Sequence, residues 1–225
     1  RQQLPDASIL MLSNEPYPAY GRPLISYLLE GKSNQETIWL RGEDFYRQLR
    51  IETLFGPEYE AVKMDADAHE VAMSNGEAVQ YASCLVATGS HPFVPPCEGL
   101  GQQENVFTFT TLDQAVPAGN EALAVTEQAH AEGPACRVMV SGAGLIGIKA
   151  AEALSKLADE IIIVEPAPRI LMAVVDDSAA LLVLQEMEQH GITCRTGVMA
   201  AEYFSEGSRI VGARLTDDAQ LDCDM

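Results

Sequence analysis

The chain has 225 residues, 47% of them hydrophobic, and a formal net charge of −19 at pH 7. This length fits one large or two modest domains with a buried core. The negative charge argues against nucleic acid or an anionic membrane as a partner, because both are negative themselves. No apolar run reaches the roughly 18 residues of a membrane span, and the first residues show no signal-peptide pattern.

The cysteines indicate a cytoplasmic protein. They are five in number, an odd count, and none has C-x-x-C spacing. Such a pattern favours reduced thiols over a disulfide framework or a zinc site. Cys84, which precedes a predicted turn on a predicted strand, is expected to be a packed core thiol.

In the first half of the chain, short apolar runs predict a strand over 8–12 and helices over 24–29 and 44–49. From residue 59 onward, alternating residues predict three short strands, over 61–64, 70–73 and 78–81. Asn75-Gly76 is a typical hairpin turn between the last two. A buried strand is expected over 84–87, followed by Thr88-Gly89-Ser90.

The second half begins at a predicted domain junction over 110–113, followed by a helix over 113–131 that is broken near Pro117 and Gly119. A strand over 138–140, a helix over 148–158 and a strand over 161–164 then form a βαβ unit. An amphipathic helix over 177–190, with Gly191 as its C-cap, leads to a third parallel strand over 192–195. Antiparallel strands are predicted over 198–204 and 209–215, and a further strand is expected beyond Met225.

The sequence Gly-Ala-Gly-Leu-Ile-Gly stands between the first strand and the helix of this βαβ unit. The first glycine permits a tight turn, the second lets a pyrophosphate approach the backbone, and the third lets the helix pack closely on the strand. The helix N-terminus adds unpaired N–H groups and a positive dipole end. The predicted dinucleotide-binding residues are Gly142, Ala143, Gly144, Leu145, Ile146 and Gly147.

Glu165 ends the second strand, 23 residues after Gly142, close to the roughly 20 expected for an acid that binds a ribose. A carboxylate there accepts hydrogen bonds from ribose hydroxyls and repels a 2′-phosphate, so NAD(H) is favoured over NADP(H). A purely structural βαβ unit is the alternative.

Four segments in a fixed order carry a family resemblance over nearly the whole chain. They are Tyr20-Gly-Arg-Pro23, Leu85-Val-Ala-Thr-Gly-Ser90, the glycine turn with Glu152, and Val164-Glu-Pro-Ala-Pro-Arg-Ile-Leu171. The chain resembles the FAD-dependent pyridine nucleotide-disulfide oxidoreductases, above all the NADH-dependent rubredoxin, ferredoxin and nitrite reductase-like flavoproteins.

This resemblance implies an α/β, Rossmann-like FAD/NAD(P)-binding fold of two domains, incomplete at both ends. Residues 1–110 would be the central part of an FAD domain whose first βα unit is missing. Residues 111–225 would be an NAD domain whose last strand is missing. We therefore expect an internal fragment of a longer enzyme, inactive alone.

The resemblance also implies sites for FAD. Ala87, Thr88 and Gly89 would lie against the flavin nucleotide, Arg22 and Pro23 would sit near the flavin, and Glu15 would bind the FAD ribose.

Two departures from the family pattern concern the reaction. Residues 15–31 contain no cysteine where the disulfide branches have a redox cysteine. The ferredoxin reductase-like branch pairs a lysine with a glutamate beside the flavin, and this chain has Tyr27 and Lys149 at those positions. Either Lys149 supplies the catalytic cation itself, or it is merely exposed on its helix.

The implied reaction is transfer of hydride from NADH to FAD, then of electrons to a protein such as rubredoxin or ferredoxin, or to a small acceptor, without a redox disulfide. No side chain is assigned as a general acid or base. A non-catalytic NAD-binding module for redox sensing or scaffolding is the main alternative, and a dithiol reductase with cysteines elsewhere is less favoured. A homodimer is left open.

Overall fold

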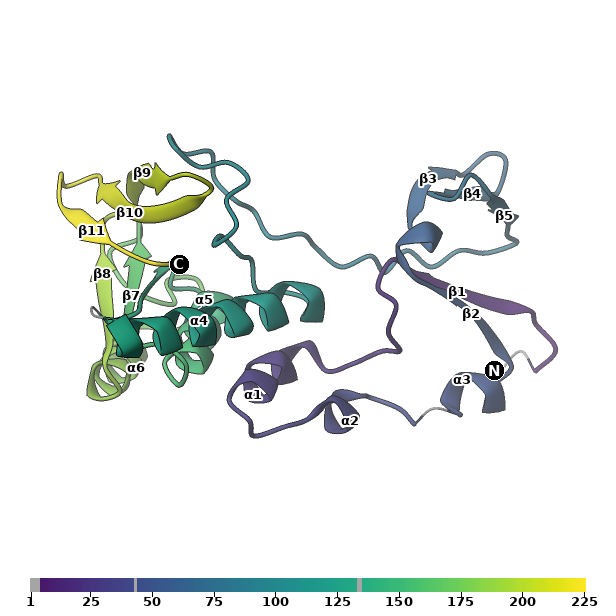
Figure 1. Cartoon of the computed structure of the whole chain (residues 1–225). Coiled ribbons are helices and arrows are strands. Elements are labelled where there is room, and N and C mark those ends of the chain that lie inside the picture. Colours follow the sequence, from purple (N-terminus) through teal and green to yellow (C-terminus); the bar gives the residue numbers. More distant parts are fainter. Residues whose placement is uncertain (1–4, 43, 133–134) are drawn as a thin grey trace. The chain divides into compact units, whose positions relative to one another are not determined.

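The computed structural model describes residues 5–42, 44–132 and 135–225, so residues 1–4 of the expected FAD domain lie outside it (Figure 1). The chain is a mixed α/β protein that forms two compact units. Unit 1 comprises residues 1–21 and 35–90, and unit 2 comprises residues 22–34 and 91–225. Among the described residues, no helix is long and apolar enough to span a membrane.

Unit 1 contains two small sheets. Strand β1 (Ile9–Ser13) pairs in parallel with β2 (Ile51–Phe55), with Ile9 opposite Ile51. Strands β3 (Ala61–Asp65), β4 (Glu70–Met73) and β5 (Ala78–Gln80) form an antiparallel sheet in that order. Gly76 in the predicted hairpin turn has a φ of 87°, a backbone conformation that favours glycine. Helices α2 (Gln35–Ile38) and α3 (Phe45–Gln48) precede β2.

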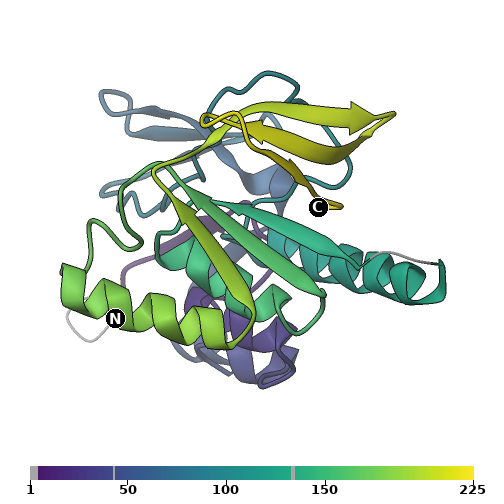
Figure 2. The same ribbon diagram turned by 90° about the vertical axis from the view of Figure 1, so that its left-hand side faces the viewer.

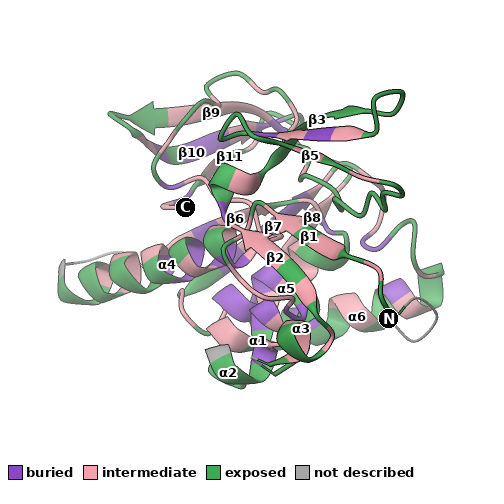
Figure 3. Cartoon of the chain, turned by 90° about the vertical axis from the view of Figure 1, so that its right-hand side faces the viewer, coloured by how far each residue is buried: buried purple, intermediate pink, exposed green. Residues whose placement is uncertain are grey.

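The buried strand predicted over 84–87 is wrong. Residues 82–90 form no strand, and Leu85 and Val86 are 90% and 62% exposed. Cys84 is accordingly an exposed thiol and not a core residue. An apolar run becomes a buried strand only when a neighbouring strand completes its hydrogen bonds, and no described strand pairs with these residues. The β3–β5 sheet, which precedes this stretch in the chain, also has little burial at its first strand, since every residue of β3 is exposed (Figure 3).

Unit 2 is built on a parallel sheet of β6 (Arg137–Ser141), β7 (Glu160–Glu165) and β8 (Ile192–Thr196). Helix α5 (Leu145–Leu154) connects β6 to β7, and α6 (Asp177–Gln189) connects β7 to β8. Strands β9 (Ala200–Glu206), β10 (Arg209–Leu215) and β11 (Gln220–Asp222) form an antiparallel sheet. Within this unit the helices lie on one side of the parallel sheet and the antiparallel sheet lies on the other (Figures 1 and 2).

The last residues of the chain extend this parallel sheet at its β6 edge. The Asp224 N–H donates to the Arg137 carbonyl, and the Met139 N–H donates to the Met225 carbonyl, both at 2.8 Å. Strand β6 stands at the edge of the three-stranded sheet, and these last residues supply hydrogen bonds on its outer side.

Helix α4 (Leu112–Glu132) is continuous, so the predicted break near Pro117 and Gly119 is wrong. A proline inside a helix removes one backbone hydrogen bond, but packing compensates for the loss here. Ala115, Ala118 and Ala122 are buried on one face of the helix. A Cβ on Gly119 would lie 2.8 Å from Leu29 Cδ2, which shows how closely α4 packs on α1 (Ile25–Leu29).

A buried asparagine fastens the loop before α4 to the antiparallel sheet. The Asn105 amide donates to the carbonyls of Ile210 and Asp224, both at 2.7 Å, and its oxygen accepts from the Ile210 N–H at 2.9 Å. With α1 packed on α4, this explains why residues 22–34 and 91–110 group with unit 2. The assignment of cofactor domains to 1–110 and 111–225 stays a prediction.

Candidate dinucleotide-binding site

The glycine turn lies between β6 and α5, as the sequence predicts. Gly142 has a φ of 104°, and its N–H donates to the Val164 carbonyl at 2.8 Å. A Cβ on Gly147 would lie only 2.0 Å from the Gly142 carbonyl oxygen, so this glycine allows the helix to pack against the turn. A Cβ on Gly144 would meet nothing within 4 Å. Open space at Gly144 is what a pyrophosphate approaching the backbone requires.

Helix α5 begins at this turn without a capping side chain. Gly144 is the N-cap residue, and Leu145 and Ile146 in the first turn are 58% and 55% exposed. The first N–H groups of a helix have no partner within the helix, and they lie at its positive end. Together with the open space at Gly144, this end of α5 fits the pyrophosphate of a dinucleotide.

Glu165 stands at the end of β7 beside this turn. Its carboxylate accepts hydrogen bonds from the N–H groups of Ala143, at 2.6 Å, and Ala167, at 2.8 Å. An ionised carboxylate offers about four lone-pair sites, so about two are left for ribose hydroxyls. Glu165 therefore holds the turn in shape and still fits the ribose. No sequence pattern predicts that Glu165 accepts hydrogen bonds from the backbone of the turn.

Of the residues expected to bind FAD, Glu15 follows β1 in unit 1. Its carboxylate accepts a hydrogen bond from the hydroxyl of Tyr20. Tyr20 is buried and contacts the rings of Tyr17 and Trp39, with centroids 6.4 and 6.3 Å away. The aromatic cluster thus fixes the carboxylate at the end of β1, where the ribose-binding prediction places it.

The other residues expected near FAD are divided between the two units. Ala87, Thr88 and Gly89 belong to the exposed stretch of unit 1, and Gly89 has a φ of 70°. Arg22 and Pro23 belong to unit 2, in a single 3₁₀ turn before α1. Arg22 donates from Nη1 to the Thr110 carbonyl at 2.8 Å. No single unit brings these five residues together.

Lys149 and Tyr27, two positions singled out by the family pattern, meet in unit 2. The Lys149 ammonium lies 4.9 Å from the centroid of the Tyr27 ring and forms an ion pair with Glu152. Lys149 is therefore held between α1 and α5.

The cysteines are all free, and burial suppresses the reactivity of most of them. Burial raises the pKa of Cys194 and of Cys223 to about 11. It also raises the pKa of the Cys97 and Cys136 thiols. These four thiols are thus mostly protonated near neutral pH, and the thiol form is a poor nucleophile. The described residues also contain no group of three or more His, Cys, Asp or Glu side chains suited to a metal ion.

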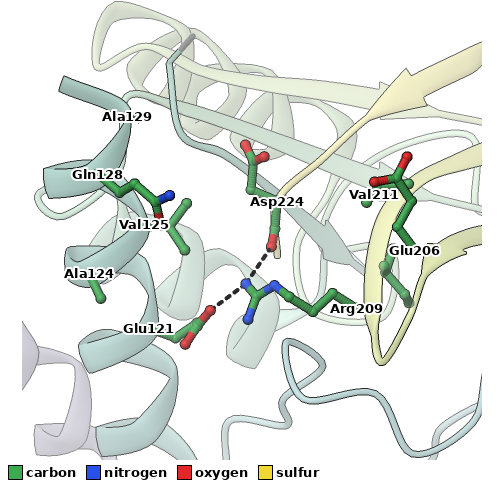
Figure 4. Close-up of a pocket in the computed structure, with 10 residues that line it drawn as sticks. Glu121, Ala124, Val125, Gln128, Ala129, Glu206, Arg209, Val211 and Asp224 are labelled. Carbon is green, nitrogen blue, oxygen red and sulfur yellow. Dashed lines mark hydrogen bonds and ion pairs between the residues drawn. The ribbon is translucent and has the colours of Figure 1, made fainter. Parts of the chain in front are cut away.

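A cavity of about 550 Å³ lies elsewhere on unit 2, between α4 and the β9–β10 hairpin (Figure 4). Arg209 extends into it, pairs with Glu121 and donates to the Asp224 carbonyl at 3.5 Å. None of the predicted cofactor-binding residues lines this cavity.

Comparisons with known proteins agree on one family. The sequence profile of the pyridine nucleotide-disulphide oxidoreductases matches residues 1–225. Terpredoxin reductase from a Pseudomonas species is 30% identical over 221 residues, covering 96% of this chain and 50% of its own length. The assimilatory nitrate reductase electron transfer subunit of Bacillus subtilis is 30% identical over 185 residues, covering 82% of this chain and 22% of its own length.

Solved structures share the fold. A ferredoxin reductase from Rhodopseudomonas palustris superimposes with a TM-score of 0.85 at 25% identity, over 98% of this chain and 51% of that one. The chain thus spans about half of the length of two of these relatives and about a fifth of the third.

Proposed function

Since the chain belongs to the pyridine nucleotide-disulphide oxidoreductase family, whose members bind FAD and NAD(H), we propose that it is part of an NADH-dependent flavoprotein oxidoreductase. In that protein, the cofactors supply hydride transfer from NADH to FAD, and the chain binds and orients them. The observation that carries this proposal is the glycine turn. It leaves Gly144 open beside an uncapped helix end, with Glu165 next to it.

Each residue in the proposed site has a role set by its chemistry. The N–H groups at the start of α5 bind the pyrophosphate, and Glu165 accepts from the ribose hydroxyls and disfavours a 2′-phosphate. Glu15 takes the FAD ribose, and Ala87, Thr88, Gly89, Arg22 and Pro23 lie along the FAD. Lys149 supplies a cation near the flavin. Hydride transfer needs no general acid or base from the chain.

For the electron acceptor we propose a small redox protein such as a ferredoxin or rubredoxin, reached without a redox disulfide. The names of relatives support this acceptor, since they include terpredoxin reductase and a probable ferredoxin reductase. The absence of cysteine from residues 15–31, and the raised pKa of four of the five thiols, argue against a dithiol relay.

Two measurements test the proposal. The 225-residue chain should bind NADH in calorimetry, and Gly144→Ala should weaken that binding. The complete gene product should be yellow, and NADH should bleach its flavin absorbance without oxygen. Added ferredoxin or rubredoxin should restore the absorbance.

A gene product that binds NADH but carries no flavin would instead be the non-catalytic NAD-binding module. A product that binds neither cofactor would refute both functions. If alkylation of the cysteine thiols of the reduced gene product stopped the electron transfer, the proposed route without a disulfide would be wrong.

A further inference from the structure

The contact between α1 and α5 contains an aromatic ring that lies close to two lysines. The ammonium of Lys149, from α5, lies 4.9 Å from the centroid of the Tyr27 ring. The ammonium of Lys32, just after α1, lies 5.7 Å from the same centroid. Both distances fall within the roughly 6 Å at which an aromatic ring attracts a cation.

Each of the two lysines also has its own carboxylate. Lys149 pairs with Glu152, three residues further along α5, and Lys32 pairs with Glu30. The Glu30 side chain is only 1% exposed, and its hydrogen bond to Lys32 raises the pKa of that ammonium. Glu30 is thus the nearest carboxylate to Lys32, whereas the Lys149 ammonium contacts the Tyr27 ring and Glu152.

A lysine side chain has four rotatable bonds and loses much freedom when it is fixed. On an exposed helix face, an ion pair three residues apart fixes it only weakly. Here the ring comes from α1 and the carboxylate from α5, so the ammonium is restrained from two elements that pack on each other. Lys149 is also only five residues past Gly144, close to the end of α5 that forms the dinucleotide site.

We propose that Tyr27 and Glu152 are positioning residues that hold the Lys149 ammonium for its role beside the flavin. This inference rests on the proposed function, and it adds two residues to the site. Tyr27 acts through the face of its ring, not through its hydroxyl. Phenylalanine should therefore replace it and leucine should not.

Nuclear magnetic resonance tests the geometry on the 225-residue chain without any cofactor. The chain has only four lysines, so their side-chain methylene signals can be separated by selective ¹³C labelling. The ring current of Tyr27 should move the Lys149 ε-methylene protons upfield of those of Lys63, which lies on the exposed strand β3. Tyr27→Leu should abolish this shift, and Tyr27→Phe should keep it.

Flavin reduction in the complete gene product tests the role. Tyr27→Leu, Glu152→Gln and Lys149→Met should each slow bleaching of the flavin by NADH severalfold, with little change in the dissociation constant of NADH. Tyr27→Phe should restore most of the rate. Lys156→Met, beyond the end of α5, is the matched control and should behave like the unaltered protein.

The two measurements separate the possible failures. If Lys149 shows no upfield shift, or if Tyr27→Leu keeps it, the proposed geometry is wrong. If the shift behaves as expected but Tyr27→Leu reduces flavin at the normal rate, the positioning role is wrong. If NADH fails to bleach the flavin of the unaltered protein, the proposed function itself fails.

Discussion

Two glycines of the turn, three residues apart, should respond differently to the same substitution. Alanine at position 147 places its Cβ 2.0 Å from the Gly142 carbonyl oxygen, a contact no relaxed structure keeps. Alanine at position 144 places its Cβ in open space, with a backbone conformation (φ −78°, ψ −179°) that alanine adopts readily. The pair therefore separates packing from ligand binding.

The magnitudes follow from the neighbouring atoms. Overpacking typically costs about 1–3 kcal/mol, and the upper end applies to Gly147 because the opposing atom is backbone held by the turn. Alanine offsets about 0.5–1 kcal/mol through its better helix propensity. The expected net loss for Gly147→Ala is about 2 kcal/mol. For Gly144→Ala, the loss is about 0.5–1 kcal/mol, because alanine is a poorer N-cap than glycine.

The variant that keeps more stability, Gly144→Ala, should be the one that loses NADH affinity. In Gly144→Ala, the added methyl group occupies the space expected for the pyrophosphate, and we expect at least about tenfold weaker binding, or about 1.4 kcal/mol. Urea unfolding measures stability, and calorimetry with NADH measures affinity on the same samples. If Gly147→Ala were as stable as the parent chain, the close contact would be wrong. If Gly144→Ala bound NADH normally, the pyrophosphate would not lie there.

Four further results are expected. NADH should bind at least about tenfold tighter than NADPH, and calorimetry showing equal affinities would remove the ribose role of Glu165. Asn105→Ala removes the side-chain partner of the buried Ile210 N–H and C=O groups and should cost at least about 2 kcal/mol in urea unfolding; a loss below about 0.5 kcal/mol would contradict this. Hydrogen bonds from His130 and, to a lesser extent, from the Cys136 N–H lower the pKa of Asp159 in the folded protein. The stability that this carboxylate contributes is therefore present above its ordinary pKa of about 4, and it is lost as the pH falls through the lowered pKa of the folded protein. Between about pH 5 and about pH 2, Asp159→Asn should therefore lose less stability than the parent chain. The same dependence of stability on pH in both proteins would contradict the hydrogen bond between His130 and Asp159. In hydrogen exchange, residues 82–90 should exchange faster than β6–β8, and equal protection would show that this stretch is ordered by contacts not described above.

The sequence predicts unit 2 well because its local and long-range signals agree. The β-branched runs become β6, β7 and β8, and the predicted strand over 209–215 coincides with β10. A buried parallel strand is indicated by an apolar run, which β6 and β7 supply. Strand β8 contains Thr193 and Arg195, and it is indicated by its place after α6 and Gly191. The glycine turn is recognisable because its spacing reflects steric needs that the structure confirms at Gly142 and Gly147.

The sequence-based predictions fail where the structure of a segment depends on contacts with residues far away in the chain. Residues 84–87 have the apolar run of a strand but no described strand beside them. Strand β2 went unpredicted because Glu52 and Thr53 interrupt its apolar pattern, and its pairing with β1 crosses about forty residues. Pro117 predicts a break, but buried alanines hold α4 together. For the same reason, no local pattern reveals that Lys149 meets Tyr27 or that Glu165 accepts from the Ala143 N–H.

The discontinuity of unit 2 has a consequence for how the protein is made. Its first segment, residues 22–34, leaves the ribosome early, but the helices on which α1 packs begin only at residues 112 and 145. The hydrogen bond from Asn105 to the Asp224 carbonyl forms later still, since Asp224 lies 119 residues further along the chain. At roughly 5–20 residues per second, α1 and the loop of Asn105 stay without their native contacts for several seconds or more. During that time, the residues of unit 1 are already synthesised, so unit 1 has time to fold before unit 2 is complete.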